Sequence, residues 1–305
     1  MQVYNIPLDS THQETTQHGN FAFPLAIYTT QINKNILGYI DWHWHHELQF
    51  CVVLQGEVDF FVNQSQFLLK KGDGIFVNAE QLHMAKNHAS SDSIYICLDF
   101  HPRMIAGFAG SILESKYVVP YLKKTDFTHC LLSPEIDWQK QILDLLLAVS
   151  GSFHSEQPDE MQIIIQLATV WHILITSESS TSSEKKGSTI SPQVKEMLQY
   201  IRANYMNPIS LDEIAEQVAL ACSTCCRVFK RQTGCTIFEY LLNVRLQEAS
   251  RLLLSSDANI TEISIRCGFS NSSYFAKEFR RKTGMSPSVY RKEKSYSRAE
   301  ILSTI

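Results

Sequence analysis

Two short basic phrases in the second half of the chain repeat the same residue types. VFKRQTG at 228–234 returns as EFRRKTG at 278–284, so that an aromatic residue, two or three cations, a threonine and a glycine recur in the same order. Lysine and arginine side chains donate charge-assisted hydrogen bonds to phosphate oxygens. A basic phrase that occurs twice within one region therefore predicts a surface that binds a polyanion at two places.

The distribution of charge supports this prediction. Residues 1–190 carry 11 Lys and Arg against 20 Asp and Glu, a balance of −9, whereas residues 191–305 carry 16 against 11, a balance of +5. All eleven histidines precede residue 173. An acidic, histidine-bearing part is thus joined to a basic part, and basic domains often bind phosphates. A basic surface that only faces solvent would have the same composition.

Other features of the sequence disfavour membrane and secreted proteins. No apolar run reaches the ~18–20 residues that a membrane span needs, and the first ten residues lack the order of charge and apolar core that marks a signal peptide. We therefore expect a cytoplasmic protein without membrane contact. The eight cysteines are scattered, which indicates reduced thiols. Cys222 and Cys225 have the spacing of a metal or redox pair, but no second pair follows, and no cofactor is expected.

From residue 191 onward the sequence pattern is helical throughout. Ser210 and Asn259 are each followed three residues later by glutamate, which is the pattern of a capping box. Each of these short capped helices leads through a turn into a basic helix that Gly234 or Gly284 ends. A short helix, a turn and a second helix make a helix-turn-helix, so the repeated phrase is explained by two such units.

The outer faces of the two basic helices carry small polar and basic residues, which suit a helix in the major groove of DNA. Phe229 and Phe279 are expected in the core instead. The linking helix of about 17 residues spans about 25 Å, so the two units would enter successive grooves roughly 34 Å apart. Two helical hairpins that merely pack together are the alternative. The residues expected on the outer faces are Ser223, Cys226, Arg227, Arg231, Ser272, Ser273, Ala276, Lys277 and Arg281.

The same stretch resembles the DNA-binding domain of the AraC/XylS family of transcription regulators. The resemblance covers about 100 residues, from Ile190 to Arg291, and includes the tail I-x4-G-F-x4-Y-F-x3-F-R-R-x-T-G-x2-P-x2-Y-R in full. It implies a regulator that binds double-stranded promoter DNA. Base-facing positions would then be held by Ser223, Cys226, Arg227, Ser272, Ser273, Ala276 and Lys277. Since Cys226 is a small hydrophobe, base readout by the first unit would depend mainly on Arg227.

The region from about Ile36 to Phe100 has the pattern of β-strands. Runs such as LQFCVVL and VDFFV are rich in β-branched and aromatic residues and are broken by glycines, as in a sandwich or barrel. HWHHELQFCVVLQGEVDF and LLKKGDGIFVNAEQLH resemble the two halves of a cupin barrel, which many AraC/XylS regulators contain. The expected fold is multidomain, with an N-terminal cupin-like β-barrel and flanking helices, and a C-terminal all-α domain with two helix-turn-helix motifs.

Four residues of this region stand where metal-binding cupins hold their ligands. They are His43, His45, Glu47 and His83. Alternation along one strand would place the first three on a shared face, and three imidazoles with a carboxylate suit a borderline divalent metal. However, eight residues separate Glu47 from Gly56, where six are usual, and the residues before His83 also depart from the metal-binding pattern.

Three interpretations of these four residues stay open. They would hydrogen-bond a small effector, or hold the open-sided metal of a cupin enzyme, or be remnants satisfied by their neighbours. A barrel joined to a DNA-binding domain favours the effector pocket. The resemblance implies a carbohydrate as the effector class. No catalytic residue and no bound metal are therefore expected, and the chain is not expected to be an enzyme.

The domain boundary is expected at a segment rich in serine and charge. SESSTSSEKKGST at 177–189 has the composition of a flexible linker. We therefore expect a sensor and dimerisation domain at 1–176 and a DNA-binding domain at 190–305. Before the linker, a helix is expected from Ser133-Pro134 and another over 159–176. Their apolar stripe would close the barrel or form the seam of a homodimer, and RNA polymerase is a further candidate partner.

Overall fold

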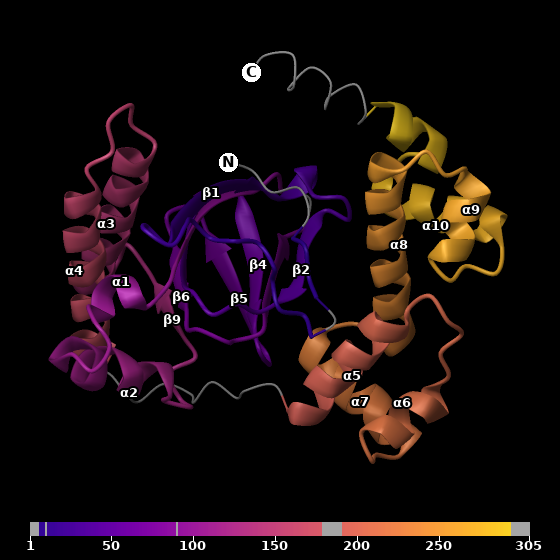
Figure 1. The fold of residues 1–305 in the computed structure, drawn as a ribbon, viewed down its shortest axis with the longest axis horizontal. Coiled ribbons are helices and arrows are strands. Elements are labelled where there is room, and N and C mark those ends of the chain that lie inside the picture. Colours follow the sequence, from indigo (N-terminus) through magenta and orange to yellow (C-terminus); the bar gives the residue numbers. More distant parts are fainter. Residues whose placement is uncertain (1–5, 10, 90, 179–190, 294–305) are drawn as a thin grey trace. The chain divides into compact units, whose positions relative to one another are not determined.

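The computed structural model describes residues 6–9, 11–89, 91–178 and 191–293. The chain forms two compact units, one built from the strands and the first four helices and the other from the helices after residue 190 (Figure 1). Within the residues described, no helix combines the length and apolar character that a membrane crossing requires.

The first unit is a barrel of two antiparallel sheets. A five-stranded sheet has the order β1-β8-β3-β6-β9, and a four-stranded sheet has the order β2-β7-β4-β5. This confirms the expected β-barrel, although β1 and β9 lie outside the region for which strands were predicted. The strands are β1 Leu25–Gln31, β2 Tyr39–His43, β3 Leu48–Gln55, β4 Glu57–Val62, β5 Ser65–Lys70, β6 Gly74–Val77, β7 His83–Asn87, β8 Ile94–Phe100 and β9 His129–Leu132.

The larger sheet separates two hydrophobic cores because successive residues of a strand face opposite sides. Phe50 and Phe76 face the helices and pack with Leu146 and Trp171. Their sequence neighbours, such as Cys51, face the second sheet and pack with the apolar residues of β4. The interior between the sheets is therefore a separate compartment, and the polar pocket described below opens into it.

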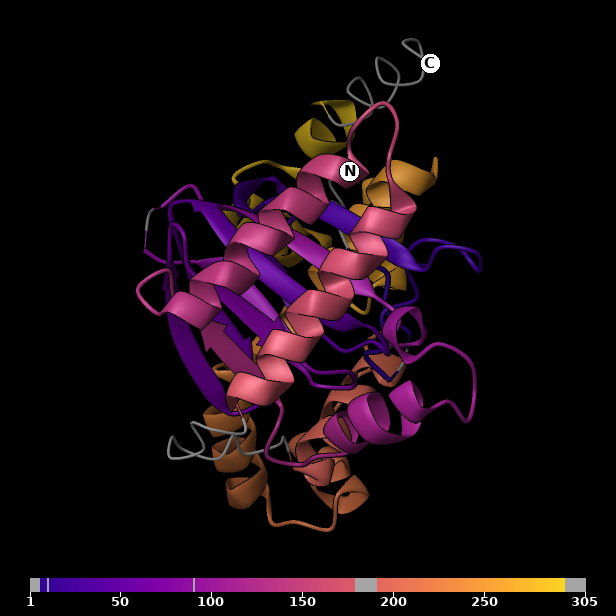
Figure 2. The same ribbon diagram turned by 90° about the vertical axis from the view of Figure 1, so that its left-hand side faces the viewer.

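Two long helices cover the outer face of the larger sheet. α3 (Asp137–Phe153) and α4 (Glu160–Glu178) lie side by side across it (Figure 2). The predicted start at Ser133-Pro134 was wrong, because Ser133 closes a turn by accepting a hydrogen bond from the Glu135 amide. Two shorter helices, α1 (Arg103–Ala106) and α2 (Val119–Leu122), precede them. The first two residues of the predicted linker belong to α4, and the rest of it lies outside the described residues.

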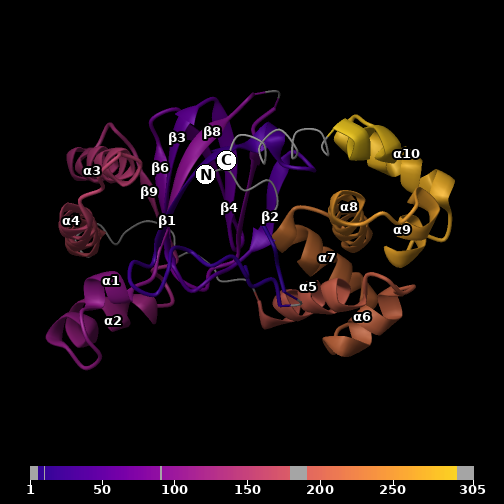
Figure 3. The same ribbon diagram turned by 45° about the horizontal axis from the view of Figure 1, so that its top comes forward.

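The second unit is helical, as predicted. α8 (Ile237–Ser255) lies between the two helix-turn-helix units, which comprise α6 (Leu211–Gln217) with α7 (Cys222–Thr233) and α9 (Ile260–Arg266) with α10 (Ser272–Thr283) (Figure 3). α5 (Pro192–Asn204) precedes them. Ser210 and Glu213 form the predicted capping box of α6. Phe229 and Phe279 are fully buried, which confirms that they belong to the core.

We expect Gly268→Ala to destabilise the second unit far more than Gly284→Ala. Both glycines have left-handed backbones, with φ of +79° and +77°, where any L side chain costs about 1–2 kcal/mol. A Cβ on Gly268 would also lie 2.5 Å from the Tyr205 carbonyl oxygen, whereas nothing lies within 4 Å of one on Gly284. Urea unfolding of the full-length variants measures the difference, and equal losses would contradict the steric argument.

Candidate functional site

The predicted DNA-facing residues of the first unit lie together on the outside of α7. Ser223, Cys226, Arg227 and Arg231 are all exposed. Positions three or four apart in sequence are neighbours on a helix surface, so these four side chains form one continuous strip. Cys225, between two of them, is buried beside the core. The strip carries two cations and begins at the first turn of the helix, where backbone N–H groups are also free to meet phosphate.

α10 presents the corresponding strip in the second unit. Ser273, Lys277 and Arg281 are exposed, while Ser272 and Ala276 are half-buried. A capping residue that was not predicted from the sequence stabilises the start of the helix. The Asn271 side chain accepts hydrogen bonds from the amides of Ser273 and Tyr274, at 2.7 and 3.2 Å, which holds the first turn in place.

The basic residues of the two strips differ in how firmly they are held. Arg281 donates from Nε and Nη2 to Glu278 Oε2 at 2.8 and 2.6 Å, and the Glu278 side chain is nearly buried. Among the described residues, Arg227 has no carboxylate within ion-pair distance. A guanidinium that a carboxylate already holds is fixed in position for contact with a phosphate. A guanidinium without such a partner keeps its N–H donors for a bidentate contact with the edge of a base.

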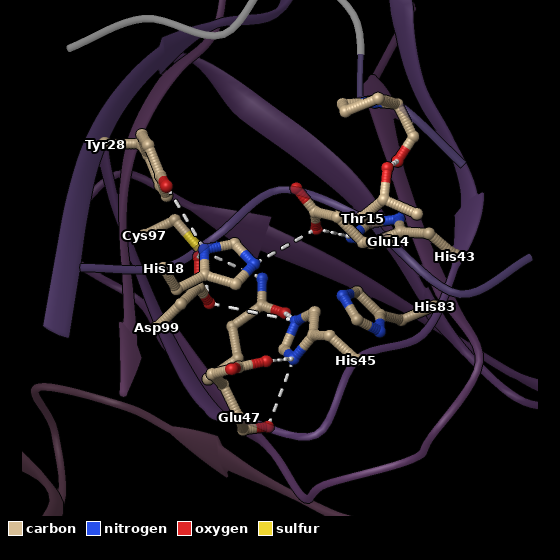
Figure 4. A network of polar contacts seen from close by, with 12 residues as sticks. Glu14, Thr15, His18, Tyr28, His43, His45, Glu47, His83, Cys97 and Asp99 are labelled. Atoms are coloured by element: carbon tan, nitrogen blue, oxygen red, sulfur yellow. Dashed lines mark hydrogen bonds and ion pairs between the residues drawn. The ribbon is translucent and has the colours of Figure 1, made fainter. Parts of the chain in front are cut away.

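In the barrel, the structure brings together three of the four predicted pocket residues. His43 ends β2, His45 follows in the connection to β3, and His83 begins β7. One ring nitrogen of each lies within 4.8 Å of those of the other two, and all three side chains are buried. The pairing of β2 with β7 places His43 directly opposite His83, and their ring centroids are 4.1 Å apart. Figure 4 shows the three rings converging on one space.

Hydrogen bonds orient each of the three imidazoles. His43 Nδ1 lies 2.7 Å from the Asp41 carbonyl oxygen, His45 Nδ1 lies 3.1 Å from that of Glu47, and His83 Nδ1 lies 2.8 Å from that of Gln81. A carbonyl oxygen only accepts hydrogen bonds, so Nδ1 carries the proton in His43 and His83, and the Nε2 atom of each of these rings is available to a ligand. The His45 ring differs, because acceptor oxygens face both of its nitrogens: the Glu47 carbonyl oxygen at Nδ1 and Oε1 of Gln49 at Nε2.

Burial keeps two of these rings neutral. Desolvation lowers the pKa of His43 to about 4, against a smaller upward effect of Glu14. Desolvation, reinforced by the neighbouring imidazoles, also lowers the pKa of His83 well below its ordinary value. Neutral imidazoles are lone-pair donors, so near neutral pH the cluster accepts hydrogen bonds or binds a Lewis acid.

Glu47 is not a member of the cluster, and the strand alternation used to place it was wrong. β2 ends at His43 and β3 begins at Leu48 in the other sheet, so no single strand carries all three residues. The Glu47 carboxylate lies 3.6 Å from Nδ1 of His45, on the side of the ring that its own backbone already occupies. An effector contact by Glu47 stays a prediction.

Gln49 occupies the position beside the cluster that was predicted for Glu47. Its Oε1 lies 3.0 Å from His45 Nε2, and its Nε2 donates to Cys51 Sγ and Cys97 Sγ at 3.1 and 2.9 Å. The sequence contains a signal for this residue, because six residues separate Gln49 from Gly56. Six residues are the usual spacing in the cupin pattern, and the spacing between Glu47 and Gly56 departs from it.

Sequence reasoning also missed three charged groups that border the cluster, Glu14, His18 and Asp99 (Figure 4). Glu14 Oε2 lies 3.5 Å from His18 Nε2 and 3.8 Å from His43 Nε2. His18 Nδ1 lies 3.7 Å from Asp99 Oδ2, and His45 Nε2 lies 3.9 Å from Asp99 Oδ1. Glu14 and His18 reach the pocket from the segment that precedes β1, outside the predicted barrel sequence.

These three groups form a buried ionic network. Burial raises the pKa of the Glu14 carboxyl, but contact with His18 and the charge of nearby imidazoles outweigh it and lower the pKa to about 2. Burial lowers the pKa of His18, but Glu14 and Asp99 outweigh it and raise the pKa to about 9. For Asp99, burial dominates and raises the pKa. At neutral pH the network therefore holds a Glu14 carboxylate paired with a His18 imidazolium.

The space between these groups is small. The cavity has a volume of about 40 Å³, and its polar walls are Glu14, Tyr28, His43, Gln49, His83 and Asp99. That volume has room for roughly three water molecules, whereas pockets for drug-sized ligands have about 300–1,000 Å³. In this conformation the cavity fits an ion with its bound waters, and a larger ligand would need the walls to move.

Comparison with known proteins agrees with both halves of the structure. Residues 36–168 match the model of the AraC-like ligand binding domain, and residues 214–293 match that of a helix-turn-helix domain. The HTH-type transcriptional regulator YdeC of Bacillus subtilis (strain 168) is 34% identical over 292 residues, which are 95% of this chain and 99% of that protein.

One further relative and one solved structure are also similar to this chain. The HTH-type transcriptional activator RhaS of Pectobacterium atrosepticum is 27% identical over 277 residues, which are 85% of this chain and 89% of the relative. The solved C-terminal domain of AraT, a response regulator from Geobacillus stearothermophilus, is 31% identical, with a TM-score of 0.34, and the match covers 35% of this chain and 88% of that domain. On the identity and coverage of the full-length match and on the two domain models, the chain belongs to the AraC/XylS family of DNA-binding transcription regulators.

Proposed function

We propose that this protein regulates transcription by placing α7 and α10 in two successive major grooves of a promoter, under the control of a small effector that binds in the barrel. The observation that carries the DNA part is the exposure of matching small polar and basic strips on the two helices. α8 has 19 residues and is therefore about 28 Å long. Together with the offsets of the flanking units, this length approaches the ~34 Å repeat of the duplex.

The base-facing set proposed here is the one expected from the sequence. In α7 it comprises Ser223, Cys226 and Arg227, with Arg231 toward the backbone. In α10 it comprises Ser272, Ser273, Ala276 and Lys277, with Arg281 toward the backbone. Because the side chains of Ser272 and Ala276 are small and half-buried, they suit a contact in which the edge of the DNA groove lies directly against the helix.

The effector would act by shifting the population of two arrangements of the chain. We propose residues 1–176 as the sensor, 177–189 as the linker and 190–305 as the DNA-binding part. Leu147 of α3 and Met161 and Ile165 of α4 are exposed apolar side chains on two helices that pack against each other. A homodimer formed through these helices would give the sensor a second copy to act on, and RNA polymerase is the partner through which activation would proceed.

A carbohydrate is the effector class that we propose to test first. Glu14, Asp99, Gln49 and the histidines supply the hydrogen-bonding groups that a polyol needs. Because the cavity measures about 40 Å³, a sugar requires the pocket to open, which would itself be the conformational signal. An enzymatic reaction at a metal in the same pocket is the alternative function, and the histidine cluster is the observation that favours it.

Replacing the two arginines separates base readout from phosphate contact. We expect Arg227→Ala to reduce the preference for specific over random DNA by about 1–3 kcal/mol, because a bidentate base contact is lost. Arg281→Ala should instead weaken binding to all duplexes about equally. Sites selected by the wild-type protein from a random duplex pool, then measured by fluorescence anisotropy against a scrambled duplex, give both quantities.

Arg251→Ala is the matched control for these two variants. Arg251 is an exposed cation of the same unit that pairs with Glu248 on α8, away from both strips. Its loss should leave affinity and preference close to those of the wild type. If Arg227→Ala behaves like Arg251→Ala, the assignment of α7 as a reading helix is wrong.

A further inference from the structure

The histidine cluster of the barrel contains a buried polar atom that lacks a partner. His83 Nε2 is fully enclosed and has no hydrogen-bond partner among the described residues. An unsatisfied buried polar atom destabilises the fold, and the great majority of buried polar atoms are paired in folded proteins. His83 and His43 both line the cavity, and a nitrogen of His45 lies within 4.8 Å of one on each of them, so a ligand in that cavity would give the atom a partner.

The orientation of two of the rings matches the way in which metal-bound histidines are held. Nδ1 of His43 and Nδ1 of His83 each donate to a backbone carbonyl oxygen, at 2.7 and 2.8 Å. Metal-ligating histidines almost always use their second ring N–H in this way, because the bond fixes the tautomer and directs the other nitrogen at the ion. A nitrogen of His45 lies within 4.8 Å of a nitrogen on each of these rings, and an ion bound to its Nε2 would replace the contact with Gln49 Oε1.

The remaining polar atoms around the cluster favour a cation over a neutral ligand. Glu14 Oε2 lies 3.8 Å from His43 Nε2, and Asp99 Oδ1 lies 3.9 Å from His45 Nε2. Gln49 Oε1 lies 3.0 Å from His45 Nε2. Two carboxyl groups and an amide carbonyl thus stand beside the imidazole nitrogens. A cavity of about 40 Å³ has room for an ion and its bound waters.

The donor set selects the class of ion. Imidazole nitrogens with one oxygen ligand suit Zn²⁺, Fe²⁺, Co²⁺ or Ni²⁺ rather than Mg²⁺ or Ca²⁺, which prefer all-oxygen sites. Zn–N bonds of about 2.0–2.1 Å place tetrahedral ligand nitrogens about 3.3 Å apart. The nitrogens here lie within 4.8 Å of one another, so small inward rotations of the rings complete the geometry. Glu14 or Gln49 stands close enough to supply the oxygen.

We propose that His43, His45 and His83 bind a divalent transition-metal ion through their Nε2 atoms, with Glu14 or Gln49 as an oxygen ligand. Metal binding stands on the pocket geometry alone. Its regulatory meaning, that the barrel senses the ion or meets its effector through it, rests on the proposed sensor function. Glu14 belongs to the segment before β1, so occupation of the site would fix that segment on the barrel.

Titration of the full-length protein with Co²⁺ and then Zn²⁺, after treatment with a chelator and dialysis, tests the site. We expect one equivalent of Co²⁺ to bind with the visible absorption of a low-coordinate nitrogen site and one equivalent of Zn²⁺ to displace it. His83→Ala should weaken metal binding by more than about 100-fold. A loss of about 100-fold is the upper limit when the residue removed only hydrogen-bonds to a metal ligand, so a larger loss identifies a ligand. His83→Gln, which keeps the volume of the side chain better, checks that the loss does not arise from misfolding.

His46→Ala is the matched control. His46 lies next to His45 in sequence but is exposed and pairs with Glu80, so its loss should leave the stoichiometry and affinity unchanged. Because the exposed Cys226 thiol is an alternative soft ligand, the metal titrations are repeated on proteins that also carry Cys226→Ser, whereas DNA binding is measured on proteins that keep Cys226. The absence of Co²⁺ and Zn²⁺ binding by a folded protein, or binding that survives both His83 variants, would overturn the site.

The same samples distinguish this failure from failure of the proposed function. Binding to a selected duplex is measured in parallel by fluorescence anisotropy. DNA binding without metal binding overturns the metal site and leaves the regulator. One equivalent of metal that depends on His83, without DNA binding, overturns the regulator and leaves the metal site.

Discussion

Affinity for DNA is expected to fall by about 500-fold when the salt concentration rises from 50 to 200 mM. Each Lys or Arg that contacts a phosphate releases counterions, and the logarithm of the binding constant falls by about 0.9 per contact for each tenfold rise in salt. The two second helices carry five basic residues outside the proposed base-facing set, and five phosphate contacts give roughly this effect. They are Lys230, Arg231, Arg280, Arg281 and Lys282.

The slope of that salt dependence can be assigned to individual residues. Lys230→Gln should reduce it by about one contact and should weaken specific and random duplexes alike. Lys140→Gln is the matched control, because Lys140 is an exposed cation of α3 that pairs with Asp144. Fluorescence anisotropy of a labelled duplex between 50 and 400 mM salt measures the slopes. Binding that does not depend on salt, or an equal change in both variants, would contradict phosphate contact by the second helices.

The architecture of the DNA-binding unit could be predicted because its determinants are local. Ser210 with Glu213 fixes the start of α6, and Gly234 and Gly284 end the two second helices in left-handed conformations. Each signal lies within a few residues of the feature that it determines. Repetition of the pattern identified the helix-turn-helix units even before the family resemblance was considered.

The pocket could be predicted only in part, because long-range strand pairing builds it. His43 meets His83 through the register of β2 and β7, which no short-range pattern encodes, and only the cupin resemblance placed the two together. Glu14 and His18 reach the pocket from a segment without strand signals. The cupin resemblance suggests Glu47, and alternation along a single strand would support it, but the chain leaves β2 at His43 and enters β3 of the other sheet at Leu48, so the alternation does not extend to Glu47.

The chemistry of the pocket depends on features that a sequence does not contain. The direction of each Nδ1 bond, the unpartnered Nε2 of His83 and the volume of the cavity are properties of the fold. The sequence favours an effector pocket because the barrel is joined to a DNA-binding domain. The metal site proposed above adds what only the geometry contains, the approach of three histidine nitrogens to within 4.8 Å of one another beside a cavity of about 40 Å³.

Phe279→Ala is expected to destabilise the second unit by about 3–5 kcal/mol, as other buried phenylalanines do when truncated to alanine. The Phe279 ring is completely buried, and its centroid lies 5.5 Å from that of Phe275 and 5.3 Å from that of Tyr290. Typical domains are stable by only about 5–15 kcal/mol. The variant should therefore unfold this unit measurably and lose DNA binding, although no base or phosphate contact has been removed.

Amide hydrogen exchange of the full-length chain measures this loss where it occurs. Tyr274→Ala on the same helix is the matched control, because Tyr274 is 50% exposed and should leave exchange in the core close to that of the wild type. Equal exchange in the two variants would contradict a core role for Phe279. The extent of the change also matters, since amides that open together belong to one cooperative unit. Faster exchange in α6 and α7 as well as in α9 and α10 would mean that α8 couples the two helix-turn-helix units, so that damage to one reading helix weakens the hold of both on DNA.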